Sequence, residues 1–311
     1  MLVACRRLLH LPSIRYNSPL ELIAIPRYPT LSHGHHRLSP EIVDSTVSNC
    51  PSDTIALSFF LWAARQPEYF HAPTSFDRIT PVVRRLSHRF GLVSGIVRHL
   101  ESFGCPIKAQ TFLILLRVYW RANMCRFALE VFDTMCRRNY VPNTFSRNIV
   151  LDIMFKRGCF DDAMSFFREF PFPNFLTYNI VLRSICKSGD WIKVRDLLRE
   201  MVGKGFHLNE GSFSMALDCF CKAGRHSELL QLFASIIVLG RRLSVIMWTI
   251  LIDSQCRNKR FEIALDHMRN MIEAGFLPTV VTFTSVIKGL ADAKMFGENP
   301  QLCLRCLHAS C

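Results

Sequence analysis

The chain has 311 residues, with 38 Lys and Arg against 25 Asp and Glu, and half of its residues are hydrophobic. This composition excludes an intrinsically disordered protein and a collagen-like one. The net charge of +13 calls for a polyanionic partner or a basic targeting segment. Because no apolar run reaches the 18 residues that a membrane-spanning helix needs, the sequence predicts no membrane insertion.

Residues 1–40 contain five Arg, four His and four Ser but a single acidic residue, Glu21. A segment rich in Arg and Ser and poor in acids is typical of an organellar transit peptide, and a disordered basic leader is the alternative. We expect import into the mitochondrion, with the chloroplast as the other destination. The first 50 residues carry only two net positive charges, so +11 remains on the rest of the chain. The folded part is therefore basic as well.

An internal repeat of 35 residues dominates the remaining sequence. The aromatic residues Tyr178, Phe213, Trp248 and Phe283 follow one another at intervals of 35, each within a similar apolar segment. A constant period of this length indicates a repeat architecture. The repeats that follow from it are 73–108, 109–143, 144–174, 175–209, 210–244, 245–279 and a partial repeat 280–296.

Each repeat reads as two helices joined by a turn. The fifteenth residue is Gly158, Gly189 or Gly224 in three consecutive repeats and Asn123 in an earlier one, and these residue types tolerate the left-handed conformation that ends a helix. One hairpin is too small to bury its own apolar face, so successive hairpins must stack. The sequence predicts an all-α fold, a right-handed superhelical solenoid. Residues 41–72 are expected to be a linker with degenerate N-terminal capping helices, in which 56–63 forms a second helix.

Within this pattern, the segments Thr177-Tyr178-Asn179, Cys186-Lys187-Ser188-Gly189 and Cys221-Lys222-Ala223-Gly224-Arg225 resemble the pentatricopeptide repeat family, and in particular P-class-like members of the plant organellar type. The resemblance covers about 73–296. Tetratricopeptide repeats have a 34-residue period and a Trp-x-x-Leu-Gly signature, which is absent here. The resemblance implies a single-stranded RNA-binding protein that reads one nucleotide per repeat and acts in organellar RNA processing, splicing or stability.

The thirteenth residue of six successive repeats is positively charged. If the first helices line one side of the solenoid, this column places one cation per repeat along the path of an RNA backbone. The alternative is compensation of the helix dipole by a cation near each C-terminus, which does not require a cation in every repeat. The predicted phosphate-binding residues are Arg85, Arg121, Lys156, Lys187, Lys222 and Arg257.

By the resemblance, the fifth and last residues of a repeat read the base. The pairs Asn148 with Asn174 and Asn179 with Asn209 match pairs that the family uses for pyrimidines. Ser214 with Ser244 and Thr249 with Thr279 have fifth residues that favour purines, although their last residues depart from the usual Asp or Asn. For Asn148 and Asn179, the alternatives are helix capping and a solvated amide.

The second residue of each repeat is expected to insert between bases. Four of these positions are apolar, at Phe145, Leu176, Ile246 and Val281. The repeat 210–244 has Gly211 instead, so we expect little stacking from it.

Two segments superficially suggest a zinc-dependent deaminase: His226-Ser-Glu228, and the spacing of Cys303, Cys306, His308 and Cys311 near the end of the chain. His226 and Glu228 follow the turn of a repeat, however, and belong to the array. Residues 297–311 form a divergent tail, as a truncated or alternatively spliced product would. We therefore expect no catalytic residue, metal or cofactor. A protein-interaction scaffold is the second alternative, and the basic column speaks against it.

Overall fold

The computed structural model describes residues 38–292, and all regular secondary structure in that range is α-helical. The predicted transit peptide lies almost wholly outside the described residues. The divergent tail, with Cys303, Cys306, His308 and Cys311, lies entirely outside them. None of the helices within 38–292 is long and apolar enough to cross a bilayer.

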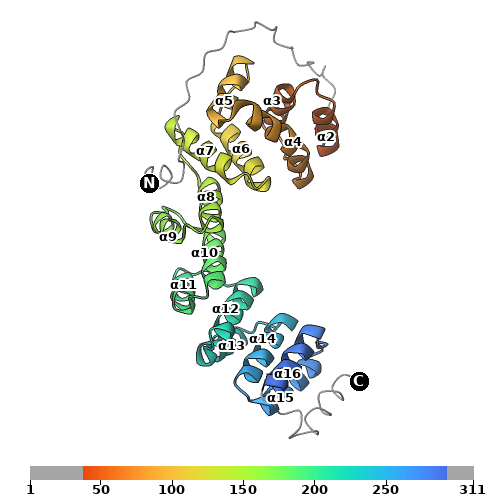
Figure 1. The fold of residues 1–311 in the computed structure, drawn as a ribbon, viewed down its shortest axis with the longest axis vertical. Coiled ribbons are helices and arrows are strands. Elements are labelled where there is room, and N and C mark those ends of the chain that lie inside the picture. Colours follow the sequence, from red (N-terminus) through yellow and green to blue (C-terminus); the bar gives the residue numbers. More distant parts are fainter. Residues whose placement is uncertain (1–37, 293–311) are drawn as a thin grey trace. The chain divides into compact units, whose positions relative to one another are not determined.

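The chain divides into two compact halves, an N-terminal half up to Pro173 and a C-terminal half from Asn174 (Figure 1). The N-terminal half contains α2 (Pro40–Ser48), α3 (Asp53–Ala63), α4 (Pro73–Phe90), α5 (Val93–Ser102), α6 (Ala109–Arg121), α7 (Cys125–Arg137), α8 (Thr144–Lys156) and α9 (Phe160–Arg168). The C-terminal half contains α10 (Phe175–Ser188), α11 (Trp191–Gly203), α12 (Glu210–Lys222), α13 (His226–Val238), α14 (Val245–Arg257), α15 (Phe261–Glu273) and α16 (Val280–Asp292).

In four repeats the turn between the two helices has the left-handed backbone that the sequence predicts. The φ angle is +55° at Asn123, +77° at Gly158, +76° at Gly189 and +66° at Gly224. Lys259 takes the same place in the repeat 245–279 with φ of +59°, although it lacks the advantage of glycine. The fifteenth residue therefore ends the first helix in all five of these repeats.

Stacking of equivalent helices builds the core of each half. In the N-terminal half α4 packs on α6 and α6 on α8, and in the C-terminal half α10, α12, α14 and α16 pack in succession (Figure 1). Ala128, Ala163 and Ala264 are fully buried, because the second helix approaches its partner at this point too closely for a larger side chain. The prediction of an all-α array of stacked hairpins is confirmed.

A further hairpin precedes the repeat 73–108. The segment 56–63 lies in α3, which packs against both α2 and α4. Apolar side chains on several sides of α3 are buried, among them Leu57, Phe60 and Leu61. This hairpin covers the apolar side of α4 that would otherwise face solvent.

One helix differs from its predicted extent. The thirteenth residue, Arg85, is predicted to end a first helix, but α4 continues to Phe90 and ends at Gly91, where φ is +67°. Arg85 therefore lies more than a turn before the C-terminus, and Arg89 is the arginine in the last turn, where a cation offsets the helix dipole. The repeat 73–108 is one residue longer than the period, and no glycine or asparagine occupies its fifteenth position.

Acid is expected to destabilise the N-terminal half through His71. Its ring stacks on Phe60 at 3.6 Å, its Nε2 lies 3.0 Å from the carbonyl oxygen of Phe60, and its Nδ1 lies 3.0 Å from the hydroxyl of Tyr69. The neutral ring satisfies both bonds by donating from Nε2 and accepting at Nδ1. Burial lowers the pKa of His71 to about 4.

Because the folded-state pKa lies below the ordinary value of 6.5, the unfolded chain binds more protons. The contribution of His71 is complete above pH 6.5 and disappears as the pH falls towards 4, a loss of roughly 2 kcal/mol after allowance for partial solvent screening. Denaturant unfolding at pH 7, 5 and 4 measures it. The variant His71→Gln should be less stable at pH 7 but show a shallower dependence on pH, and equal pH dependence in both proteins would contradict this assignment.

Candidate nucleic-acid interface

The basic column lies on exposed surface of the first helices. Arg121, Lys156, Lys187, Lys222 and Arg257 occupy the last turns of α6, α8, α10, α12 and α14. The sequence therefore placed these five cations correctly along their helices. It did not indicate what they contact.

Two members of the column bind carboxylates from a neighbouring helix. Arg85 in α4 holds Asp53 at the start of α3 with two nitrogens, at 2.6 and 2.9 Å. Arg121 in α6 binds Asp77 in α4 at 2.9 Å. Asp77 is the fifth residue of the repeat 73–108, a repeat for which no base-reading pair is predicted.

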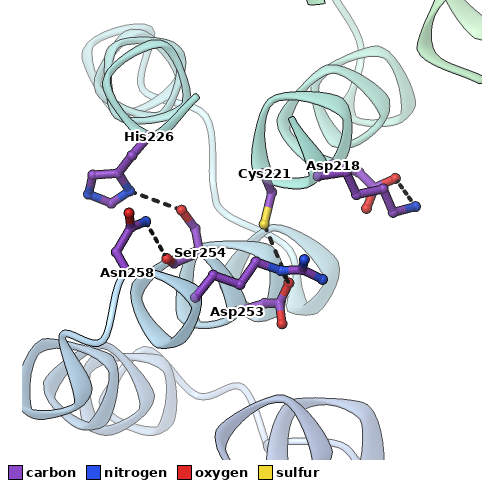
Figure 2. A network of polar contacts seen from close by, with 8 residues as sticks. Asp218, Cys221, His226, Asp253, Ser254 and Asn258 are labelled. Atoms are coloured by element: carbon purple, nitrogen blue, oxygen red, sulfur yellow. Dashed lines mark hydrogen bonds and ion pairs between the residues drawn. The ribbon is translucent and has the colours of Figure 1, made fainter. Parts of the chain in front are cut away.

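Three further members bind a carboxylate four residues earlier on their own helix. Lys156 contacts Asp152, Lys222 contacts Asp218 and Arg257 contacts Asp253, each at 2.7 Å. Figure 2 labels the acids of the last two pairs, Asp218 and Asp253, and Asp253 also accepts a hydrogen bond from the Cys221 thiol at 3.4 Å. Hydrogen bonds to the aspartates raise the pKa of Lys222 and of Arg257. A phosphate would have to compete with a carboxylate at all five paired positions.

The repeat 175–209 departs from this arrangement. Its ninth residue, where three other repeats have aspartate, is Arg183. Arg183 and Lys187 are both exposed, and no carboxylate lies within ion-pair distance of either among residues 38–292. Together with Lys222 they line a groove of about 620 Å³ between α10 and α12. Unpaired positive charge is thus concentrated on α10.

This concentration could have been found in the sequence by comparing the ninth column with the thirteenth. The ninth residues are Asp152, Arg183, Asp218 and Asp253 in consecutive repeats, and residues four apart are neighbours on a helix surface. Sequence reasoning considered the thirteenth column alone and missed Arg183.

The last residues of the repeats cap the helices that follow. Asn174, Asn209, Ser244 and Thr279 each accept a hydrogen bond from the backbone N–H three residues later, at 2.8 to 3.4 Å. In α8 the cap is Asn143. The capping alternative is therefore wrong for Asn148 and Asn179, which lie one turn inside their helices.

The fifth residues lie close to these caps but are less exposed. Asn148 is buried, and Asn179, Ser214 and Thr249 are half-buried. The role of these residues in reading bases stays a prediction.

The second residues of the repeats are apolar side chains on exposed surface. Phe145, Leu176, Ile246 and Val281 are between 39% and 65% exposed, although residues of these types are mostly buried. They lie in the first turns of α8, α10, α14 and α16, next to the capping residues. Apolar surface thus recurs beside the polar groups in several repeats.

The H-x-E segment makes ordinary structural contacts. Figure 2 shows the His226 ring directed at Ser254, whose hydroxyl lies 2.9 Å from Nδ1. Glu228 binds Arg225 at 2.8 Å, and its hydrogen bonds to Arg225 and Ser227 lower its pKa to about 2. No group of three or more metal-ligating side chains occurs in the described part of the chain.

Stacked helix hairpins with a repeated pattern of caps, exposed apolar residues and cations define an α-solenoid repeat protein. The PPR repeat family matches residues 173–234 and 243–292, and the PPR repeat itself matches 110–140 and 145–171. These matches cover more than half of the chain, which therefore belongs to the pentatricopeptide repeat family.

Similar proteins come from plants. A putative pentatricopeptide repeat-containing protein of Arabidopsis thaliana is 34% identical over 194 residues, which are 61% of this chain and 32% of the relative. A mitochondrial pentatricopeptide repeat-containing protein of the same species is 25% identical over 157 residues, 49% of this chain and 34% of the relative. The chain thus spans about a third of the length of these relatives.

Among solved structures, the pentatricopeptide repeat protein PPR10 from maize superimposes with a TM-score of 0.58. The superposition covers 88% of this chain and 44% of the maize protein, at 16% sequence identity. At this identity the likeness concerns the fold. The maize protein has also been crystallised with an 18-nt psaJ RNA element.

Proposed function

We propose that this chain is a sequence-selective single-stranded RNA-binding protein that acts in organellar RNA processing, splicing or stability. The observation that carries the proposal is the exposed pair Arg183 and Lys187 on α10, the helix whose first turn also carries the exposed apolar Leu176. Unpaired cations next to apolar side chains suit a strand whose phosphates and bases must be bound together. The RNA complex of the maize protein supports the same class of ligand.

The mechanism that fits these features is occupancy. One repeat contacts one nucleotide, and the bound protein shields the segment from nucleases or keeps it unpaired. The chemistry of the described residues supplies cations, amides and hydroxyls for binding. By the family resemblance, the repeats 144–279 would read a tract of two pyrimidines followed by two purines.

The mitochondrion is the compartment that we propose. The basic, acid-poor composition of residues 1–40 supports it. So do the names of several Arabidopsis thaliana relatives, which include the word mitochondrial.

Binding selection on random single-stranded RNA, carried out with the full chain at moderate and high salt, tests the function. The expected result is enrichment of a short motif and an affinity that falls as salt rises. Asn179→Thr should change the preferred base at one position of that motif. Absence of RNA affinity at moderate salt would reject the proposal and favour a protein-interaction scaffold.

Replacing Gly211 by valine is expected to raise the affinity for RNA by roughly threefold, because it supplies the apolar side chain missing from the repeat 210–244. A Cβ atom at Gly211 would meet only Asn209 Oδ1, at 3.6 Å, so the side chain has room. Fluorescence anisotropy with the selected RNA measures the change. Gly211→Ala is the control, since it stiffens the helix without adding a stacking surface, and an equal gain from both variants would contradict the stacking role.

A further inference from the structure

In the C-terminal half, two of the predicted base-reading pairs are each bridged by an additional side chain. The hydroxyl oxygen of Ser212 lies 2.7 Å from Asn179 Oδ1 and 2.8 Å from Asn209 Oδ1. Asn179 and Asn209 are the fifth and last residues of the repeat 175–209, whereas Ser212 is the third residue of the next repeat. Ser212 is completely buried, so water does not compete for its hydroxyl.

The same arrangement recurs two repeats later. The hydroxyl oxygen of Thr282 lies 2.8 Å from the hydroxyl of Thr249 and 3.2 Å from that of Thr279. Thr249 and Thr279 are again the fifth and last residues of one repeat, and Thr282 is the fully buried third residue of the following one. The bridging hydroxyls of Ser212 and Thr282 therefore share both their position in the repeat and their chemistry.

The repeat 210–244, which lies between these two, lacks a bridging hydroxyl. Its predicted base-reading pair is Ser214 and Ser244, and the third residue of the following repeat is Met247, which has no hydroxyl. Ser214 Oγ is buried and has no hydrogen-bond partner among residues 38–292. Within the described residues, the hydroxyl of Ser244 makes only the capping hydrogen bond from the Met247 N–H, at 3.4 Å. A single substitution in the third column thus leaves a predicted base-reading hydroxyl without an internal partner.

We infer that the third residue of the following repeat is a positioning residue for base recognition, an inference that rests on the proposed function. The last torsion of an asparagine side chain has a broad, roughly two-fold energy profile, so a lone amide can present either its oxygen or its nitrogen. A buried hydroxyl that bonds one end of the amide selects one orientation. The reading unit then consists of three side chains rather than two.

The geometry also assigns the orientation at Asn179. Asn209 Oδ1 already accepts the backbone N–H of Ser212 at 2.8 Å. Because Asn179 Oδ1 faces the buried Ser212 hydroxyl at 2.7 Å, the Nδ2 amino group of Asn179 remains to donate to the base. This repeat therefore recognises a base edge that presents an acceptor, such as a pyrimidine carbonyl or ring nitrogen.

The repeat 210–244 is expected to discriminate poorly for the opposite reason. An untethered serine hydroxyl can rotate to donate or to accept, so it satisfies several base edges equally well. A hydroxyl introduced at Met247 would supply the missing partner of Ser214. Removing the Ser212 hydroxyl should therefore lower base selectivity at the repeat 175–209. Adding a hydroxyl at position 247 should raise it at the repeat 210–244.

The test uses the full chain and a set of single-stranded RNAs that carry each of the four bases at the nucleotide opposite the repeat 175–209. Ser212→Ala should reduce the preference for the best base by roughly five- to tenfold, the value of one hydrogen bond. The salt dependence of binding should not change. Ser212→Thr keeps the hydroxyl and should preserve the preference.

At the adjacent nucleotide, Met247→Thr should increase base discrimination by a similar factor. Met247→Val has the same shape as the threonine variant without the hydroxyl and should leave the preference as it is. Thermal unfolding of all four variants reports whether the array remains folded. Because Met247→Thr predicts a gain, the inference stays testable even if Ser212→Ala weakens the fold.

The outcomes separate the inference from the proposed function. If the wild-type chain binds RNA and Ser212→Ala lowers the affinity equally for all four bases, the hydroxyl is structural and the inference is overturned while the function stands. Equal behaviour of the threonine and valine variants at Met247 would overturn it as well. If the wild-type chain binds none of the RNAs, the proposed function fails and the inference fails with it.

Discussion

The double variant Arg183→Ala, Lys187→Ala is expected to bind single-stranded RNA about tenfold more weakly at low salt than the wild-type chain. Loss of two phosphate contacts should also reduce the slope of log affinity against log salt by about 1.4, since each contact on a single strand contributes about 0.7. The effect is expected to be large because both side chains are exposed and lack a carboxylate partner among the described residues. Titrations at several salt concentrations measure both quantities.

The double variant Lys222→Ala, Arg257→Ala removes the same amount of charge from positions that are ion-paired. It should have a smaller effect, because Asp218 and Asp253 already offset these cations at 2.7 Å. Asp218→Asn should conversely strengthen binding by freeing Lys222. Equal losses from the two double variants would show that ion pairing does not control the contribution of a cation, and an unchanged salt slope for Arg183→Ala, Lys187→Ala would remove α10 from the phosphate path.

Gly289→Ala is expected to destabilise the packing of α16 on α14 by about 1 to 3 kcal/mol, the usual cost of an overfilled core. A Cβ atom at Gly289 would lie 2.7 Å from Cys256 Cβ and 3.3 Å from a ring carbon of Phe261. Neither the Cys256 Cβ nor the ring of buried Phe261 can move aside without shifting a helix. The cost should exceed the gain of up to about 1 kcal/mol that alanine brings to a helix.

Gly203→Ala in α11 is the matched control. It too lies in a helix, but no atom lies within 4 Å of its added Cβ, so it should be neutral or stabilising. Because stacked repeats can open locally, hydrogen exchange of the amides of α14 and α16 is a better measure than a single melting temperature. Equal protection in the Gly289→Ala and wild-type chains would contradict the close approach.

Much of the fold follows from features that act within one hairpin. The left-handed turns at Gly158, Gly189 and Gly224 were identified from residue type and spacing, and their φ angles confirm them. The extent of α4 was not, because its first turn-forming residue is Gly91, beyond the fifteenth position of the repeat.

Only part of the candidate site could be predicted from the sequence. The 35-residue period identifies Lys187 as the thirteenth residue of its repeat and Asn179 as the fifth. It does not show that Ser212, which contacts the nearby cap Asn209, also contacts Asn179, because that second contact joins residues 33 apart in the chain. The importance of Met247 depends on the unpartnered hydroxyl of Ser214 among residues 38–292, which the sequence does not show.

The sequence by itself determined the 35-residue period, the helix hairpins, the turns and the membership of a helical-repeat class, because these depend on local conformation and on apolar spacing within one hairpin. Only the tertiary structure decided that Arg85 and Arg121 are neutralised by a neighbouring helix, and which hydroxyls join the reading pairs. Ion pairs and hydrogen bonds act over about 3 Å, so a partner on another helix is selected by the stacking of adjacent helices, and residue type alone does not specify that distance.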